Sequence, residues 1–302
     1  MTTDEFAERL PDETGSDGDG TRRRRVARVT DGSATPGEPY RTDGGGPGDE
    51  AYADLGATTE RAMEIAETSM DRVRELVPDE TLADRLRQKA VHATGDPEFQ
   101  HLLRFTAPET GDDVEPVRAG ARAVLGERPI VTDITMVQSG VTGRGHDCPV
   151  WKAIGNGAEL AAETGMTRTA ASVLELDREG TYDDAVAVVG NAPTAALALA
   201  DCIEDGTRPA VVVATPVGFV KAEESRRRLR RVAAAHGVPA ITNVGRRGGS
   251  GLAAGLTNEL IHVASDARDG EVSLAADEHG GDGAGGQRPD GGDDPRPDGG
   301  DA

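Results

Sequence analysis

Three glycine-bearing segments of this sequence have the residue types of an anion-binding turn. They span residues 190–194, 215–219 and 245–250, and each lies between a short apolar run and a longer amphipathic run. A turn that starts a helix presents backbone N–H groups without a partner in the helix, and such groups bind anions. We therefore expect these turns, with Asn191, Pro193, Thr194 and Gly218 among their residues, to contact an anionic small molecule.

The third of these segments adds side chains that could hold the anion. Arg246 and Arg247 carry guanidinium groups that suit a carboxylate or a phosphate. Gly248 and Gly249 allow a ligand to approach the backbone closely, and Ser250 is either the N-cap of the next helix or a ligand of the anion. In a chain with 54 acidic and 33 basic residues, arginines placed on such a turn are informative.

His92 is the candidate for acid chemistry. It falls in the last turn of a helix predicted to start after Thr81 and to end near Gly95, where the partial negative charge of the helix end would favour a protonated imidazole. The alternative is a partly buried histidine that only hydrogen-bonds a backbone carbonyl. Ser69 lies on a helix predicted over residues 59–76, where it could also serve packing alone.

Several familiar motifs are absent. No G-x-G-x-x-G or G-x-x-x-x-G-K-[ST] follows a predicted strand, which disfavours a nucleotide enzyme. The hydrolase pattern G-x-S-x-G fails around Ser250, because Leu252 occupies the last glycine position. His146, Asp147 and Cys148 lack a second ligand pair, so we interpret them as a solvent-exposed loop rather than a metal site.

The elements that must position these residues follow a βαβ pattern. Strands are predicted at residues 130–134, 185–189, 210–214 and 240–244, and helices at 195–203, 223–236 and 251–263. Parallel strands with right-handed crossovers place their following turns at one edge of the sheet. The sequence thus predicts an α/β fold with a mostly parallel sheet, N-terminal helices and one shared site.

The two ends of the chain are poor in core-forming residues. We predict a disordered acidic tail at residues 1–54, one α/β domain at 55–268, and a disordered Gly/Asp-rich tail at 269–302. The run from Arg22 to Arg25 is short and lies within the first tail, so it gives little reason to expect a nucleic-acid or membrane patch.

The formal net charge of −21 argues against a nucleic-acid partner. A strongly acidic, arginine-biased composition suits concentrated salt, where charge repulsion is screened, and we expect a halophilic source. Cys148 and Cys202 are the only cysteines, which fits a reducing cytoplasm. No run is long and apolar enough for a membrane helix or a signal peptide.

Six collinear segments resemble the precorrin-8X methylmutases, including their cobalt-precorrin-8 counterparts. The carrying segments, taken in chain order from about residue 59 to 264, are Val91-His92-Ala93-Thr94-Gly95-Asp96, Asp133-Ile134-Thr135-Met136-Val137 with Ser139-Gly140-Val141, Thr167-Arg168-Thr169, Gly190-Asn191-Ala192-Pro193-Thr194-Ala195, Pro216-Val217-Gly218-Phe219-Val220 with Glu223-Glu224-Ser225, and Gly245-Arg246-Arg247-Gly248-Gly249-Ser250.

This resemblance implies a three-layer α/β/α fold and a methyl migration within one corrin-ring precursor on the path to cobalamin. It implies His92 as the acid, no cofactor beyond any cobalt carried by the substrate, and a homodimer with sites near the subunit interface. The residues that it places around the polycarboxylate macrocycle are Ser69, Gly140, Val141, Arg168, Asn191, Pro193, Thr194, Gly218, Arg246, Arg247, Gly248, Gly249 and Ser250. Two alternatives stay open: a corrinoid-binding protein without chemistry, and a nucleotide-binding α/β enzyme.

Overall fold

The structure, a computed structural model, describes residues 60–275. Residue contacts divide the chain after Pro36, and all described residues belong to the second unit, Gly37–Ala302. The predicted N-terminal tail, and most of the predicted C-terminal tail, lie outside the described residues.

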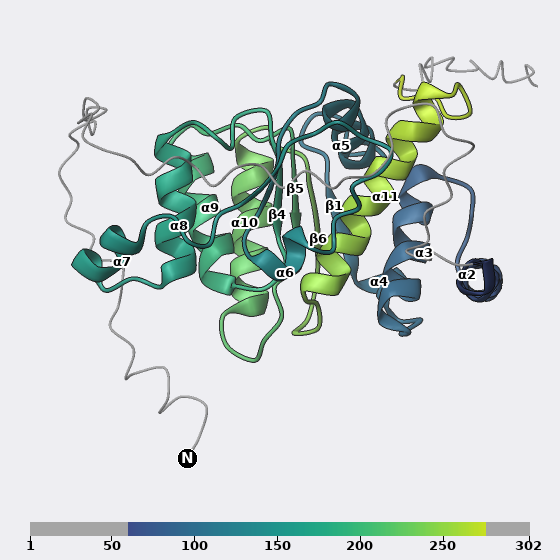
Figure 1. The fold of residues 1–302 in the computed structure, drawn as a ribbon, viewed down its shortest axis with the longest axis horizontal. Helices are drawn as coiled ribbons and strands as arrows, with labels where there is room; N and C mark the ends of the chain where they lie inside the picture. Colours follow the sequence, from purple (N-terminus) through teal and green to yellow (C-terminus); the bar gives the residue numbers. More distant parts are fainter. Residues whose placement is uncertain (1–59, 276–302) are drawn as a thin grey trace, which may run out of the picture. The chain divides into compact units, whose positions relative to one another are not determined.

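A six-stranded sheet forms the centre of the described region (Figure 1). Its strand order is β1-β6-β5-β4-β2-β3; β1 pairs antiparallel with β6, and all the other pairs are parallel. The strands are β1 (Leu103–Thr106), β2 (Ile130–Thr132), β3 (Val150–Lys152), β4 (Val186–Val189), β5 (Val211–Ala214) and β6 (Ala240–Asn243). Because β4, β5 and β6 are neighbours and parallel, the turns after them lie side by side at one edge.

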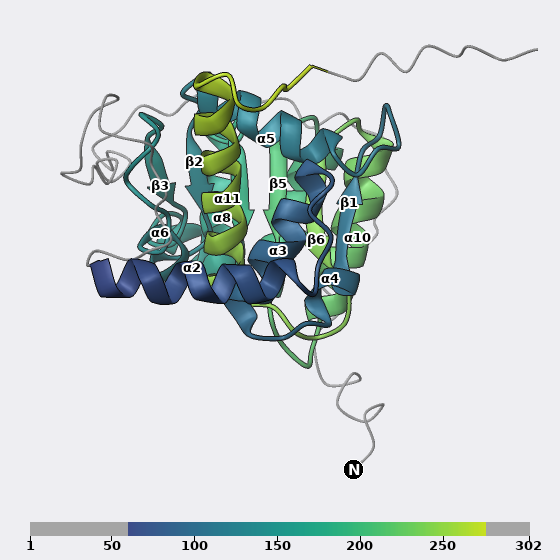
Figure 2. The ribbon, with the colours of Figure 1, turned by 90° about the vertical axis from the view of Figure 1, so that its right-hand side faces the viewer.

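Helices cover both faces of this sheet. α8, α9 and α10 lie on one face, and α3, α5 and α11 lie on the other (Figures 1 and 2). In β4, Val186 and Val188 enter the core beneath the second group, whereas Ala187 and Val189 enter the core beneath the first, since side chains alternate along a strand. The expected three-layer α/β/α fold is confirmed.

The helices of the described region have the following bounds: α2 (Glu60–Arg74), α3 (Leu82–Thr94), α4 (Phe99–Leu102), α5 (Glu115–Leu125), α6 (Thr135–Gln138), α7 (Ala158–Thr164), α8 (Arg168–Arg178), α9 (Pro193–Glu204), α10 (Ala222–Ala235) and α11 (Ser250–Arg268). The predicted βαβ units agree with β4 to α11 except at helix ends. The strand predicted at 130–134 is shorter, because Ile134 is already the N-cap of α6.

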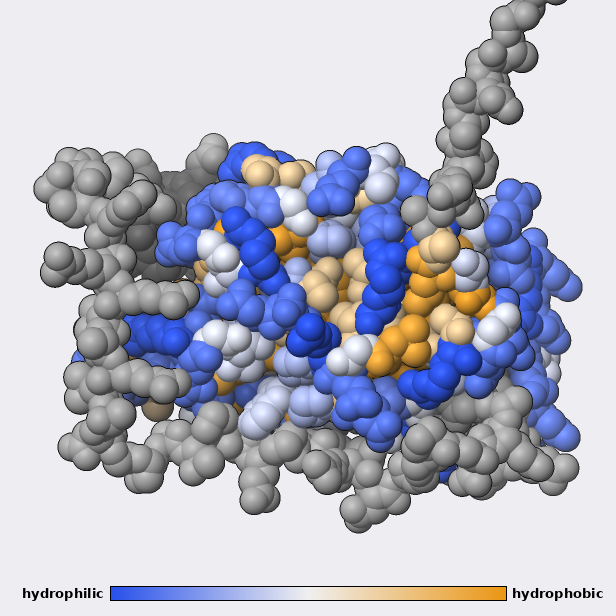
Figure 3. Space-filling view, turned by 90° about the horizontal axis from the view of Figure 1, so that it is seen from above, coloured by the Kyte–Doolittle hydropathy of each residue, from blue (hydrophilic) through white to orange (hydrophobic). Residues whose placement is uncertain are grey.

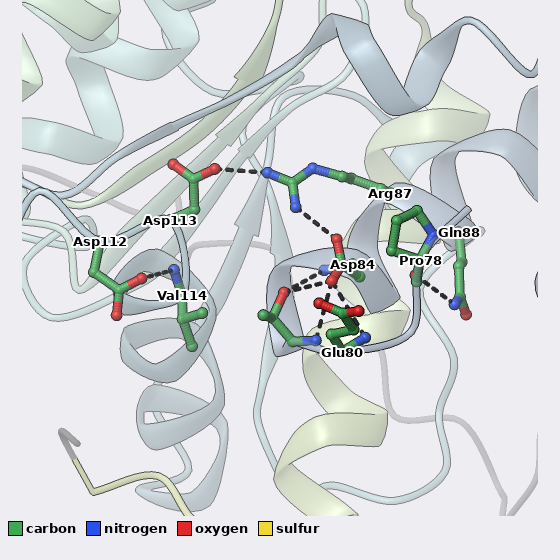
Figure 4. Close-up of polar contacts among 9 residues, drawn as sticks. Pro78, Glu80, Asp84, Arg87, Gln88, Asp112, Asp113 and Val114 are labelled. Carbon is green, nitrogen blue, oxygen red and sulfur yellow. Dashed lines mark hydrogen bonds and ion pairs between the residues drawn. The ribbon is translucent and has the colours of Figure 1, made fainter.

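A hydrogen-bonded cap fixes the start of α3 (Figure 4). Thr81 accepts a hydrogen bond from the Asp84 backbone N–H, and the Asp84 carboxylate accepts one from the Thr81 N–H at 3.0 Å. Arg87 donates to Asp84 at 2.7 Å and to Asp113 at 2.6 Å. Burial raises the pKa of Asp84, but the Thr81 hydroxyl and Arg87 outweigh it and lower the pKa. The predicted cap at Thr81 is confirmed, and it sets where the last turn of α3 lies.

Buried charges join α3 to α11. Arg85 contacts Glu259 at 2.9 Å and Asp266 at 2.6 Å. Burial raises the pKa of Glu259, but the His262 hydrogen bond and the charge of Arg85 more than offset it and lower the pKa to about 2. A buried carboxylate that stays ionised in this way holds the two helices in one register.

The chain continues beyond α11 in a packed segment. Val272 and Leu274 are partly buried against the core, and Arg122 donates to the Leu274 carbonyl at 2.9 Å. Residues 272 and 274 therefore pack against the core beyond the boundary predicted at residue 268. Because this segment is rich in polar residues and glycine, its two larger apolar side chains, which alternate along the chain, did not indicate that it packs against the domain.

Hydrophilic side chains dominate the face that carries α5 and the end of α11, where they surround small apolar patches (Figure 3). Within residues 60–275, no helix is long and apolar enough to cross a membrane.

Candidate active site

A cleft of about 510 Å³ opens beside His92, between α2 and α3. Its walls combine apolar side chains with a few polar ones. The lining residues are Glu64, Ile65, Thr68, Ser69, Arg72, Val73 and Leu76 from α2 and its C-terminal end, and Val91, His92, Gly95 and Pro97 from α3 and the loop after it. A ligand seated there would contact His92 directly.

Ser69 and His92 meet in this cleft. The Ser69 hydroxyl lies 3.0 Å from His92 Nδ1, and no hydrogen bond to the other ring nitrogen, Nε2, occurs within residues 60–275. Gly95, with φ 66°, ends α3 in a left-handed cap whose N–H donates to the Val91 carbonyl. His92 is half-buried in the last turn of α3, as predicted, and it bonds a side chain rather than a backbone carbonyl.

The pKa of His92 is lowered, which corrects the expectation of a protonated imidazole. Burial is the larger cause, because it disfavours the charged ring, and the positive charge of Lys89 adds to it. Lys89 lies one turn earlier on α3 and is itself only 8% exposed. These two effects exceed the attraction of the helix end, so the ring is mainly neutral at pH 7.

The turn after β4 is not the open anion cradle that the sequence predicts. The carboxylate of Asp133, which follows β2, accepts hydrogen bonds from the N–H groups of Gly190, Asn191 and Ala192 at 2.9–3.1 Å. Asp133 is 1% exposed, and burial raises its pKa against the opposing effect of these bonds. The Asp133 carboxylate therefore occupies the N–H groups that a bound anion would need. The side chain of Asn191 is exposed and stays accessible to a ligand.

The turns after β5 and β6 are joined by their backbones. Gly249 donates to the Thr215 carbonyl at 2.7 Å, and Gly218 donates to the Arg246 carbonyl at 3.2 Å. A side chain at Gly248 would place its Cβ 2.3 Å from the Thr215 oxygen, which explains the need for glycine there. The predicted meeting of these turns is therefore borne out by direct contacts.

Buried Arg226 fixes the shape of the turn after β6. Its guanidinium donates to the side chain of Asn243 at 2.7 Å and to the carbonyls of Arg247, at 2.8 Å, and Gly245. Burial, together with the nearby charge of Arg230, lowers the pKa of Arg226 to about 10. This arginine follows the Glu-Glu-Ser segment, and its position on an amphipathic helix gave no sign that it would point inward.

The two arginines of the third turn have different surroundings. Arg247 forms ion pairs with Asp96 and with Glu98, the latter at 2.7 Å, so it ties the turn to the loop after α3. Arg246 is exposed, and its guanidinium lies 5.1 Å from the centre of the Phe219 ring. Arg247 is therefore paired with carboxylates of this chain, whereas Arg246 is exposed beside an aromatic ring; the role of both as carboxylate anchors stays a prediction.

Ser250 begins α11 as its first residue, and Gly249 is the N-cap. The predicted capping role of Ser250 is wrong, because the helix starts one residue earlier than its apolar pattern indicates. Ser250 is 7% exposed, and its Cα would lie 3.0 Å from a Cβ at Gly190. It packs the third turn against the first.

Other predicted contact residues lie on nearby loops. Arg168 is exposed at the start of α8, and Thr167 caps that helix. Thr194 accepts from Thr167 at 2.8 Å and lies 3.0 Å from Thr169, so hydroxyls gather beside Pro193 at the start of α9.

The loop after α6 is packed more tightly than expected. A Cβ at Gly140 would lie 2.8 Å from Ala254, and Val141 is only 6% exposed. The Gly140 carbonyl accepts from Asn258 at 2.9 Å. This loop supports α11 and can offer a ligand little beyond its backbone.

His146 is half-buried rather than solvent-exposed, which corrects the expectation for its loop. Its Nδ1 accepts from the Cys148 N–H at 3.1 Å, so Nε2 carries the proton and donates to the Thr142 carbonyl at 2.7 Å. Within residues 60–275 there is no group of three or more His, Cys, Asp or Glu residues that could hold a metal ion.

Comparison with known proteins agrees with this architecture. The sequence model of the precorrin-8X methylmutase family matches residues 64–263. A cobalt-precorrin-8 methylmutase of Methanocaldococcus jannaschii is 32% identical over 223 residues, which cover 70% of this chain and 99% of the relative. A precorrin-8X methylmutase of a Sinorhizobium species is 35% identical over 212 residues, which cover 68% of this chain and 94% of the relative.

A solved structure shows the same fold. The crystal structure of a precorrin-8X methylmutase from Thermus thermophilus superimposes with a TM-score of 0.58 at 34% identity, over 69% of this chain and 99% of that chain. The matched family region contains the cleft beside His92 and the turns after β4, β5 and β6. This chain belongs to the precorrin-8X methylmutase family and is an isomerase.

Proposed function

We propose that this protein moves a methyl group between neighbouring carbons of a corrin-ring precursor in cobalamin biosynthesis, on cobalt-precorrin-8 or precorrin-8X. The observation that carries the proposal is the apolar cleft that places His92 and Ser69 together in a member of this family. A flat macrocycle needs an apolar slot, and its carboxylates need cations and N–H groups at the rim. Arg168 and Arg246 are exposed and suited to that task.

His92 serves as the general acid in this proposal. Its imidazole donates a proton to the conjugated ring as the methyl group migrates, and recovers a proton when the conjugated system is restored. General acid catalysis of this kind typically contributes about 10²- to 10⁴-fold. Carboxylates of the bound substrate oppose the effect of Lys89 and raise the pKa of His92, so the acid is charged when it is needed.

Replacing His92 tests this role. His92→Ala should lower turnover by about 10²-fold or more while substrate still binds, because the ring carboxylates contact other residues. Product analysis and a spectral titration measure the two quantities. His101→Ala, at an exposed position of α4, is the matched control and should behave as the wild type. Normal methyl migration in His92→Ala would contradict the role, and binding without turnover in the wild type would favour a corrinoid carrier.

No added cofactor should be required. A methyl migration within one molecule has no net oxidation or reduction, and any cobalt would be held by the macrocycle itself. Turnover that depends on an added nucleotide, or that is lost on dialysis against a chelator while the substrate stays intact, would contradict this expectation.

The active form proposed here is a cytoplasmic homodimer. α2 packs mainly on α3 and leaves Ile65 64% exposed and Leu76 55% exposed at the rim of the cleft. Apolar side chains that form a contiguous exposed patch often mark a site of contact with a partner. A second copy that packs on α2 would also help to enclose the substrate, and sedimentation of the purified protein would report it.

A further inference from the structure

The turn after β5 ends in an exposed apolar tip. Phe219 is 87% exposed, Val220 59% and Val217 43%, although Pro216 and Ala222 on either side are buried. A phenylalanine this exposed is unusual on a surface as hydrophilic as that of this protein. A bound molecule that covers Phe219 would remove this apolar surface from water.

The tip is preformed. Its base is held by the Gly218 to Arg246 hydrogen bond, and Gly218 adopts a φ of 151°. Lys221 has a φ of 59°, a left-handed conformation that is unfavourable for a non-glycine residue. The chain therefore accepts strain at the residue where the tip turns back into α10.

Arg246 completes a pair with Phe219. Its guanidinium lies 5.1 Å from the ring centre, within the range of a cation–π contact. No ion pair to Arg246 occurs within residues 60–275, whereas Arg247 beside it is bound to Asp96 and Glu98. Although the chain has a net charge of −21, Arg246 is not paired with a carboxylate of the described residues. Its guanidinium is therefore available to an anion of a bound ligand.

This pair is connected to the cleft beside His92. Arg247 forms ion pairs with Asp96 and Glu98. Pro97, which lies between these two acidic residues, and Gly95, which precedes them, line the cleft. Arg247, the residue after Arg246, therefore links the turn after β6 to the wall of the cleft.

We propose that Phe219 and Arg246 together form a clamp for one edge of the substrate, in which Arg246 binds a side-chain carboxylate and Phe219 covers the adjacent ring face. This inference rests on the proposed function. An aromatic face beside an unpaired cation matches a flat, carboxylate-bearing macrocycle in both shape and charge. Binding of the carboxylate orients the guanidinium, and the ring keeps water from that contact.

The test is a spectral titration of the macrocycle with four variants. Phe219→Ala and Arg246→Gln should each weaken binding about tenfold, from the loss of an aromatic contact and of a charged hydrogen bond. Phe219→Tyr and Arg246→Lys should recover much of the affinity. The double variant should lose less than the product of the single losses, since the two side chains act on one substrate edge.

Matched controls separate the clamp from a general effect of surface charge or of stability. Arg231→Gln removes an exposed arginine far along α10 and should bind as the wild type. All variants should keep the wild-type Tm, because both clamp side chains are exposed. Wild-type affinity in both Phe219→Ala and Arg246→Gln would overturn the clamp, as would dissociation of a dimer with unchanged affinity. If the wild type itself neither binds nor converts the macrocycle, the proposed function fails instead.

Discussion

At the residue scale, the surroundings of His92 favour its neutral form. Burial and the positive charge of Lys89 both lower its pKa, and the Ser69 hydroxyl lies 3.0 Å from Nδ1. In the proposed mechanism, the carboxylates of the bound substrate raise this pKa and make the imidazole an effective acid. Under that proposal, proton donation depends on occupancy of the cleft.

Lys89 offers a direct test of this electrostatic control. Removing a positive charge near an imidazole favours the protonated ring, so Lys89→Met should raise the pKa of His92. If the imidazolium is the acid, kcat/KM falls as pH rises through that pKa, which lies below 6.5 in the wild type. The falling limb should therefore move to higher pH in Lys89→Met.

Lys89→Arg is the matched control, since it keeps the charge and should leave the limb in place. Imidazole NMR measures the pKa of His92 itself alongside the rate profile. A His92 pKa that is equal in Lys89→Met and the wild type would show that burial alone is responsible.

Single residues of the site could be predicted when their own type and place were informative. His92 in a last helical turn and Arg246 in an acidic chain are of this kind. Asp133 and Arg226 were not predicted, because the backbone groups that they bind lie 57–59 and 19–21 residues away in the sequence. No side-chain pattern in the sequence marks such bonds.

At the scale of elements, the turns after β5 and β6 depend on contacts between backbones. Gly248 has a φ of 152° and no room for a Cβ, whereas Gly251, three residues later in α11, has no atom within 4 Å of its Cβ position. Glycine is required at the first position and is a disadvantage at the second.

The two glycines therefore form a matched pair for mutation. Gly248→Ala should lower the free energy of unfolding by about 3 kcal/mol, because both φ and the Thr215 oxygen oppose a methyl group. Gly251→Ala should be neutral or raise it by about 0.5–1 kcal/mol. Urea denaturation measures both, and a tolerated Gly248→Ala would show that the turn can relax.

Elements with a continuous buried run were predicted, and partly exposed strands were not. β4 and β5 are fully buried and apolar, and β6 is fully buried and begins with Ala240 and Ile241, which makes these runs visible in sequence. β1 and β3 carry partly exposed side chains, so they lack the apolar run that marks a buried strand. The meeting of α2 with α3, which forms the cleft, depends on packing that no local pattern encodes.

At the scale of the whole molecule, the net charge of −21 predicts a stability that depends on salt. Like charges repel in dilute buffer, and salt screens them within about 3 Å at 1 M. We therefore expect Tm to rise between 0.1 M and 3 M KCl by at least about 5 °C, or roughly 2 kcal/mol for a domain of this size. Calorimetry in KCl, with sucrose as an uncharged control, measures it, and a Tm independent of KCl would contradict a halophilic origin.

The bond between Asp133 and the turn after β4 has a consequence for how this protein can change. Because the carboxylate holds three backbone N–H groups, the path of the turn does not depend on the exposed side chain of Asn191. That position is free to vary while buried Ala192 and the start of α9 stay in place. New substrate preferences could thus arise there by single substitutions, without loss of the scaffold that presents them.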